Sequence, residues 1–547
     1  MPQPLFREFK HTLQKNVARL AYNSLLYGWS LSGDIPRQLV LKPADLWPGQ
    51  AEKGRWLIHG GIFTLSDDQL ELHNANWHPE EVSDAWIRHL HGFDWLRDLR
   101  ALGGNAGRLA ARAMIESWMD HHHGWHELYW RPDILGRRIA AWLTAYDFYG
   151  ESASAEFQER LFLSLSRQVR HLARALPGSL SGLPLLHAVR GLTFAGVALE
   201  GREAQLEQAL NLLDREIDRQ ISKDGGGVTR HPGDMMEILK ILIDLRATLR
   251  QAGFPPLDKI QSAIDRMVPA LRFFRHGDGK FALFNGAQEG EDDTIKYVLL
   301  QSGARARTIS SLPKTGYERI ALGKSILIMD TGRAPAYPYD VSAHCAPLAF
   351  EWSYGRDRVF VNCGSHPTQE DWQDALRATP AHNALTIDHR NVCEIHRDGS
   401  LSRKPKKMVV SREEKSGGIL IDACHDGYLP LSGITHRRRI FMGDQGHDIR
   451  GEDNLTCSVG LGRVHTVSVR FHLHPRVTGS LVNDGKDVLL RLPSGTGWRV
   501  SCEGATLALD DSVYLGEGTR PRKTKQIVLT TLMDSDFKQI KWVCQKE

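Results

Sequence analysis

Two histidines and an asparagine in the C-terminal half of the sequence have side chains suited to a metal site. His344 comes before the apolar run LAFEWSYG, Asn362 lies near the end of DRVFVNCG, and His382 opens HNALTID. Residues at the ends of neighbouring strands can converge on one point, and two imidazoles with an oxygen ligand suit zinc. Buried histidines that only form hydrogen bonds are the alternative, and sequence position does not decide between the two.

A second group of polar residues comes directly before an apolar helical run. His231 and Asp234 lie in the segment RHPGD, and the run begins at about Met235. A histidine and an aspartate at the start of a helix can act as a base and the group that orients it. They also fit a simple helix cap, in which the aspartate caps the helix and the histidine has no role.

A third segment combines aromatic residues with a pair of arginines. Trp125 and Trp130 precede Arg137 and Arg138, and Trp142 follows about one turn later. Guanidinium groups bind carboxylate or sulfate in a fork-like geometry, while indole rings can stack on sugar faces. The segment therefore predicts a binding site for an acidic sugar, with an amphipathic helix that has arginine on its solvent side as the alternative.

The hydrophobic pattern divides these segments between a helical half and a β half. From about residue 75 to 275, apolar residues recur at three- and four-residue spacing, which predicts about six or seven successive helices. After about Gly316 the spacing changes to two, and many short apolar runs joined by polar turns predict an antiparallel sandwich. The predicted parts are an N-terminal arm (1–45), a helical domain (46–310) and a β domain (311–547).

The composition is that of a globular protein and limits the classes of ligand. The 547 residues include 69 Lys+Arg against 65 Asp+Glu, a net charge of +4 with the 25 histidines counted as neutral. So small a surplus gives no reason to expect nucleic acid binding, although it suits an anionic ligand in a local basic cleft. The seven cysteines are odd in number and form no CxxC pair, which argues against a disulfide framework or a zinc ribbon.

Export and membrane signals are also not apparent in the sequence. The N-terminal segment has basic residues but no uninterrupted apolar stretch followed by a small-residue cleavage site. No apolar run approaches the roughly 18 residues needed to cross a membrane. The sequence therefore predicts a cytoplasmic protein without a transmembrane segment, with the periplasm as the alternative.

The order of several segments resembles the heparinase II/III-like family. The resemblance runs from about residue 55 to 475 and is carried by GRRIAAW, PLLHAVRGLTFAG, DGGGVTRHPGDMMEIL, SAHCAPLAFEWSYGRDRVFVNCGSHP, RATPAHNALTID, HDGY, THRRRIFM and GEDNL. It implies an incomplete (α/α) toroid followed by an antiparallel β-sandwich. It also implies a polysaccharide lyase that acts on uronic-acid glycans, such as heparan sulfate or alginate, by β-elimination.

This elimination needs donors that neutralise the uronate carboxylate, a base for the C5 proton and an acid for the leaving oxygen. In the family, an Asn–His pair begins the helix that here reads LLHAVRGLTFAG, and counting back from Phe194–Gly196 places this pair on Leu183 and Pro184. The family's tyrosine falls on Asp234, with His231 at the serine position of the same motif. Two central catalytic positions therefore differ from the family pattern.

The resemblance nevertheless suggests a role for each type of group. His187 and one of the two arginines, Arg137 or Arg138, are expected to meet the carboxylate. Either His231 or Asp234 is expected to take the proton, and either Tyr337 or Tyr339 to protonate the leaving group. The family's two zinc histidines match His344 and His382, whereas Asn362 replaces the usual carboxylate, which predicts weak zinc binding at most.

The function predicted from the sequence is a lyase of anionic oligosaccharides or polysaccharides, including glycosaminoglycans, with altered catalytic positions. The first alternative is a non-catalytic glycan-binding or scaffold protein that has lost lyase activity. The second is a hydrolase with paired carboxylates such as Asp234 and Glu237, which would have to lie about 5–10 Å apart. The expected partner is an anionic glycan and not a nucleic acid, and the sequence leaves open whether the chain forms a homodimer.

Overall fold

The computed structural model describes residues 21–72 and 76–547. Contacts between backbone atoms divide the chain into two compact units. Unit 1 comprises Met1–Ile217 and Ile241–Ile260, and unit 2 comprises Asp218–Lys240 and Gln261–Glu547. Residues 1–20 of the predicted N-terminal arm lie outside the described residues, and the rest of the arm contains one short helix, α2 (Leu25–Ser30). The predicted boundary near residue 310 stays a prediction.

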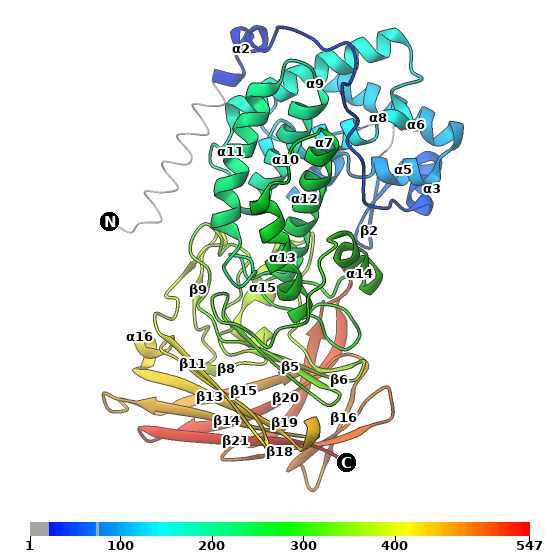
Figure 1. Ribbon diagram of the computed structural model, residues 1–547. Helices are drawn as coiled ribbons and strands as arrows, with labels where there is room; N and C mark the ends of the chain where they lie inside the picture. The colour runs from blue at the N-terminus through cyan, green and yellow to red at the C-terminus, as the bar shows by residue number, and fades with distance from the viewer. Residues whose placement is uncertain (1–20, 73–75) are drawn as a thin grey trace. The chain divides into compact units, whose positions relative to one another are not determined.

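Unit 1 consists mainly of helices, which Figure 1 shows in blue to green. After α2 they are α3 (Ala51–Gly60), α4 (Asp84–Gly92), α5 (Leu96–Leu102), α6 (Gly104–His121), α7 (Pro132–Thr144), α8 (Tyr146–Tyr149), α9 (Ala155–Ala175), α10 (Gly182–Ala198) and α11 (Glu203–Gln220). The hairpin β1 (Ile62–Leu65) and β2 (Asp68–Glu71) is inserted after α3, and α12 (Pro232–Gln251) starts in unit 2 and ends in unit 1.

The two central helices of unit 1, α7 and α10, are packed unusually closely at a pair of glycines. A Cβ on Gly136 would lie 2.3 Å from the carbonyl oxygen of His187, and one on Gly191 would lie 2.3 Å from the carbonyl oxygen of Gly136. Both distances are far below van der Waals contact, so these positions need glycine. The close approach brings Arg137 on α7 next to His187 on α10.

Unit 2 contains three larger antiparallel sheets. The five-stranded sheet has the order β3 (Ser311–Leu312), β4 (Tyr317–Leu322), β5 (Ser325–Asp330), β6 (Phe350–Tyr354), β7 (Asp357–Phe360). The eight-stranded sheet has the order β11 (Met408–Lys415), β12 (Gly418–His425), β13 (Ile434–Gly443), β14 (Asp448–Cys457), β21 (Phe537–Lys546), β18 (Gly497–Glu503), β17 (Asp487–Arg491), β16 (Thr478–Val482). The four-stranded sheet has the order β19 (Thr506–Tyr514), β20 (Arg522–Met533), β15 (His465–His472), β8 (Leu385–Ile387).

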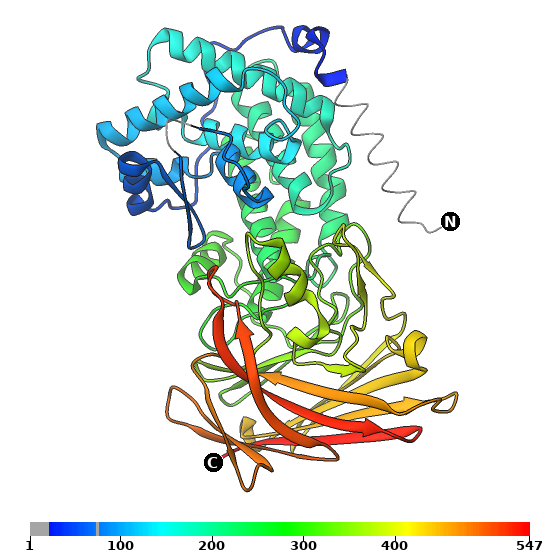
Figure 2. The same cartoon turned by 180° about the vertical axis from the view of Figure 1, so that it is seen from behind.

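The remaining helices and turns precede these sheets or lie between their strands. They are α13 (Asp258–Phe273), α14 (Asp292–Gln301), α15 (Glu370–Arg377), α16 (Leu429–Ser432), the 3₁₀ turns η2 (Thr379–Ala381) and η3 (Asp444–Gly446), and the hairpin β9 (Glu394–Ile395) and β10 (Leu401–Ser402). Figure 2 shows the long orange and red strands of the C-terminal segment from the reverse side.

The three sheets share one apolar core. Inward-facing residues of the eight-stranded sheet, such as Ile440 and Trp542, are almost fully buried there, and the Trp542 ring stacks on Phe350 of the five-stranded sheet. Helices in the N-terminal part and antiparallel sheets in the C-terminal part confirm the predicted α-then-β order. Within the described residues, none of the helices combines the length and the apolar character that crossing a bilayer requires.

Candidate functional site

In unit 1, Arg137 links an acidic and an imidazole side chain. Its Nη1 lies 3.0 Å from Asp94 Oδ2, and its Nη2 lies 2.5 Å from His187 Nε2. Because a guanidinium group only donates, the nitrogen of His187 must accept this hydrogen bond. Burial alone would raise the pKa of Asp94, but Arg137 and other arginines nearby lower it below its usual range. The result is a half-buried cation that is already paired with a carboxylate.

Arg138 lies in the interior of the same unit. Its side chain is 0% exposed, and it donates to Gln168 Oε1 and to the carbonyl oxygens of His91 and Tyr129. Its guanidinium group also lies 4.0 Å from the ring centre of Trp118. These contacts hold the helices together, so of the two arginines expected to bind an acidic sugar, Arg137 alone retains solvent exposure.

The three tryptophans expected to stack on sugars differ in the same way. Trp130 is 2% exposed and Trp142 is 0% exposed, so their rings are part of the helical core. Trp125 is half-buried, and its ring centre lies 5.5 Å from that of Tyr22. Of the three tryptophans, Trp125 is therefore the one that keeps solvent exposure.

In unit 2, His231 caps the N-terminus of α12. The backbone N–H of Asp234 donates to His231 Nδ1 over 3.1 Å. The sequence suggested a cap by the aspartate, and the structure places the histidine in that role. Because Nδ1 accepts, the neutral ring carries its proton on Nε2. His231 is half-buried, and its Cδ2 is 3.3 Å from the position that a Cβ on Gly286 would occupy.

Two residues that the sequence analysis did not single out connect this turn to the five-stranded sheet. Asn285 Nδ2 donates to the carbonyl oxygen of Arg230 over 3.1 Å and to the Tyr317 hydroxyl over 2.8 Å, while its Oδ1 accepts from the backbone N–H of His344. Asn285 has a positive φ of 52° and is followed by glycine. This Asn-Gly pair was the signal available in the sequence, because such pairs favour tight turns.

Arg230 fixes the same turn from the other side. Its guanidinium group donates to Asp330 Oδ1 over 2.6 Å and to the carbonyl oxygens of Thr315 and Gly316, and it lies 4.5 Å from the ring centre of Tyr317. Both charged side chains are almost fully buried. A buried ion pair with these hydrogen bonds holds the start of α12 rigidly against the sheet.

The rings of His344 and His382 lie next to each other, tilted by 38°. Their ring centres are 4.5 Å apart, and the two Nε2 atoms are buried without a hydrogen-bond partner. Burial lowers the pKa of His382 to about 3. Burial places the pKa of His344 well below its usual range, and the neighbouring His382 and Arg377 side chains lower it further. Both rings are therefore neutral at physiological pH.

Asn362 is held by backbone groups. Its Nδ2 donates to the carbonyl oxygen of Leu283, and its Oδ1 accepts from the N–H of Asn383, each over 3.2 Å. The two unpartnered imidazole nitrogens fit a zinc ion, but this oriented amide supplies no charge to complete the set. Across residues 21–72 and 76–547, no cluster of three or more His, Cys, Asp or Glu side chains could hold a metal. Weak zinc binding stays a prediction.

The two tyrosines expected to act as acids lie in the loop between β5 and β6. The Tyr337 side chain is 51% exposed, and Tyr339 is half-buried. The loop is anchored by the fully buried Asp340, whose carboxylate accepts from the N–H of Leu401 and pairs with Lys404. These contacts fix the base of the loop and leave Tyr337 at the surface of unit 2.

Comparison with known proteins agrees with this description. Residues 304–543 match a family model described as "Heparinase II/III-like, C-terminal". The chain is also 31% identical over 541 residues to FtsZ-localized protein C of Caulobacter vibrioides. The alignment covers 93% of this chain and 91% of that protein.

Solved structures of heparinases share the fold. The crystal structure of heparinase III matches with a TM-score of 0.75 at 14% identity, covering 100% of this chain and 92% of that one. The heparan sulfate lyase HepC from Pedobacter heparinus matches with a TM-score of 0.61 at 15% identity, covering 97% and 90%. The likeness confirms the predicted architecture of an α toroid followed by a β-sandwich.

Proposed function

The chain belongs to the heparinase II/III-like family, and from that premise we propose that it binds an acidic glycan without cleaving it by β-elimination. The binding part of this proposal rests on unit 1. Arg137 is a partly exposed cation of α7, and Trp125, in the segment before this helix, is half-buried. A guanidinium group suits the carboxylate or sulfate of an acidic sugar.

The proposed loss of cleavage is supported by the hydrogen bonding and protonation of the histidines in unit 2. His231 Nδ1 is occupied by a backbone N–H, and the other nitrogen of its neutral ring already carries a proton, so the ring cannot accept one from a sugar. His344 and His382 have open Nε2 atoms, but burial lowers their pKa values far below neutrality. They are therefore weak bases for a reaction that needs a base poised near the working pH.

Binding and cleavage are tested on the same samples. The purified protein is titrated calorimetrically with heparan sulfate and alginate oligomers, and absorbance near the ultraviolet edge reports any unsaturated product. We expect binding without new absorbance, and Arg137→Ala to weaken binding by about tenfold, or about 1.4 kcal/mol. Arg160→Ala is the matched control, since Arg160 is a surface arginine of unit 1 that is also paired with acidic residues.

Two results would overturn the proposal. Absorbance that grows with time and disappears in His231→Ala would make the chain a lyase. Failure of every acidic oligomer to bind would remove the glycan ligand. New reducing ends without absorbance would indicate hydrolysis, for which Asp234 and Glu237 are the candidates.

A second function is favoured by the name of the bacterial relative, which states that it localises with FtsZ. Since 93% of this chain matches that relative, association with FtsZ is proposed for this chain as well. A fluorescent fusion expressed in the native cell, imaged together with FtsZ, tests this directly. A diffuse signal in dividing cells would contradict it.

A further inference from the structure

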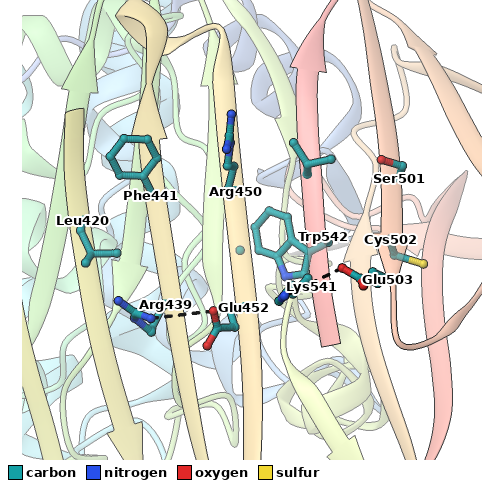
Figure 3. Close-up of a pocket in the computed structure, with 12 residues that line it drawn as sticks. Leu420, Arg439, Phe441, Arg450, Glu452, Ser501, Cys502, Glu503, Lys541 and Trp542 are labelled. Carbon is teal, nitrogen blue, oxygen red and sulfur yellow. Dashed lines mark ion pairs between the residues drawn. The ribbon is translucent and has the colours of Figure 1, made fainter. Parts of the chain in front are cut away.

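The solvent-facing side of the eight-stranded sheet contains a cavity of about 570 Å³ (Figure 3). Strands β12, β13, β14, β21 and β18 form its floor. Its volume lies within the range of about 300–1,000 Å³ that is usual for small-molecule sites. Trp542 belongs to the lining, but its ring points toward the core, where it stacks on Phe350 and donates to Asp453. We call this cavity the sheet-face pocket.

One row of side chains across the floor is largely apolar. Strand register pairs Leu420 with Phe441, Phe441 with Arg450, and Arg450 with Val543. The Phe441 ring lies beside two glycines, since a Cβ on either Gly418 or Gly443 would come within 2.7 Å of it. Leu420, Phe441 and Val543 are half-buried, so they form an apolar platform on the solvent-facing side of the sheet.

The neighbouring row alternates in charge from strand to strand. In register order it consists of Asp422, Arg439, Glu452, Lys541 and Glu503. Adjacent strands are about 4.8 Å apart, so donors and acceptors alternate at that spacing along the edge of the platform. Figure 3 shows the pairs Arg439–Glu452 and Lys541–Glu503 beside Phe441 and Arg450.

Asp422 already accepts from Arg437 outside the row and Glu452 accepts from Asn454, but the ion pairs within the row leave hydrogen-bonding capacity on the other members. The distances are 3.5 Å from Arg439 to Asp422, 3.8 Å from Arg439 to Glu452 and 3.9 Å from Lys541 to Glu503. All three exceed the 2.7–3.2 Å or so of an N–H···O hydrogen bond. The Nε of Arg439 is buried without a hydrogen-bond partner. A ligand with paired donors and acceptors fits between such groups.

We propose that the sheet-face pocket binds a neutral saccharide. A pyranose ring has an apolar C–H face that packs on Phe441, and its hydroxyls both donate and accept, as the alternating row requires. An acidic sugar is disfavoured, because the cationic side chains of the lining are interspersed with Glu452 and Glu503 and leave a net charge of only +1. An apolar peptide or lipid is disfavoured too, because it would remove water from these charges without replacing their hydrogen bonds.

This inference does not depend on the function proposed above. The acidic-glycan site is argued from Arg137 and Trp125 in unit 1, whereas the sheet-face pocket belongs entirely to unit 2. The two ligands also differ, since one is an acidic glycan and the other a neutral saccharide. An experiment can therefore contradict either proposal without contradicting the other.

The test uses an array of neutral glycans that includes chitin, cellulose and starch oligomers, probed with the full-length protein. We expect at least one neutral oligomer to bind, and its dissociation constant, measured by calorimetry, to change little between low and high salt. Phe441→Ala should weaken this binding at least tenfold, and Glu452→Gln should weaken it severalfold. Phe537→Ala is the matched control, since Phe537 is an exposed phenylalanine of the same sheet outside the pocket.

Three results would overturn the inference. The first is that no neutral glycan on the array binds. The second is that binding is equal in the wild type, Phe441→Ala and Glu452→Gln. The third is that Phe441→Ala weakens binding of heparan sulfate oligomers by the same factor, which would indicate one common site. Thermal melting of each variant confirms that it is folded, and Glu452→Gln keeps the test valid if Phe441→Ala unfolds.

Discussion

Acid is expected to destabilise unit 2, because several of its buried histidines are neutral in the folded state. Burial lowers the pKa of His382 to about 3 and that of His472 to about 4. In an unfolded chain a histidine has a pKa of about 6.5. Below that pH the unfolded state binds protons that the folded state does not yet bind, so the free energy of unfolding falls as the pH falls.

The size of the effect follows from the same values. One pKa unit corresponds to about 1.4 kcal/mol, so lowering the pH from 7 to 5 costs about 2 kcal/mol for each ring. His382 and His472 together therefore lower the free energy of unfolding by about 4 kcal/mol at pH 5. For His382 the loss continues until about pH 3, where it levels off because the folded state then binds the proton as well.

Urea unfolding at pH 7 and pH 5 measures this difference. In His382→Asn, the difference between the two pH values should shrink by about 2 kcal/mol, because one titrating ring is gone. His389→Asn, at an exposed histidine of the same unit, should keep the wild-type difference. If His382→Asn keeps the full difference, the ring is not held neutral by burial, and the argument that it is a weak base fails with it.

Three further outcomes are expected. Gly136→Ala should destabilise the chain by roughly 1–3 kcal/mol, seen as a lower melting temperature, because the new Cβ overlaps the α10 backbone; an unchanged melting temperature would contradict this packing. Asp330→Asn should cost about 3–5 kcal/mol in urea unfolding, because it leaves the buried guanidinium group of Arg230 unpaired; a loss below 1 kcal/mol or so would contradict the buried pair. Zinc titrated into the metal-free protein should bind weakly, and Asn362→Asp should tighten binding at least tenfold by adding a charged ligand; equal affinities would place any bound zinc elsewhere.

The fold could be predicted from the sequence because buried side chains recur at a regular spacing along each helix and strand. In β13, the segment THRRRIFM alternates between core and solvent, and this alternation was enough to identify a strand. The same period does not tell which charged residue of such a run faces the core. Arg438 does so, and it donates to Asp453 over 2.7 Å. A buried charge is stable only with its partner in place, and the partner lies on the next strand of the fold.

The site was predicted less well, for a related reason. Arg137 and Arg138 are adjacent and chemically identical, and their roles are separated by the close packing of α7 on α10. The local sequence around Arg138 does not indicate that its hydrogen-bond partners are Gln168 and two backbone carbonyls. Likewise, RHPGD contains two plausible caps for one helix, and backbone geometry at the turn selects the histidine.

The capping role of His231 links the stability of the fold to the proposed loss of cleavage. A helix N-terminus has unsatisfied N–H groups, and an acceptor there contributes about 1 kcal/mol to stability. As long as Nδ1 accepts from Asp234, the neutral ring cannot also take a proton at Nε2, so the stabilising arrangement excludes the catalytic one. The buried pair of Arg230 and Asp330 next to it holds the turn rigidly, which makes a switch between the two arrangements costly. A binding protein gains from such a rigid turn, whereas a lyase would have to break the cap in every catalytic cycle.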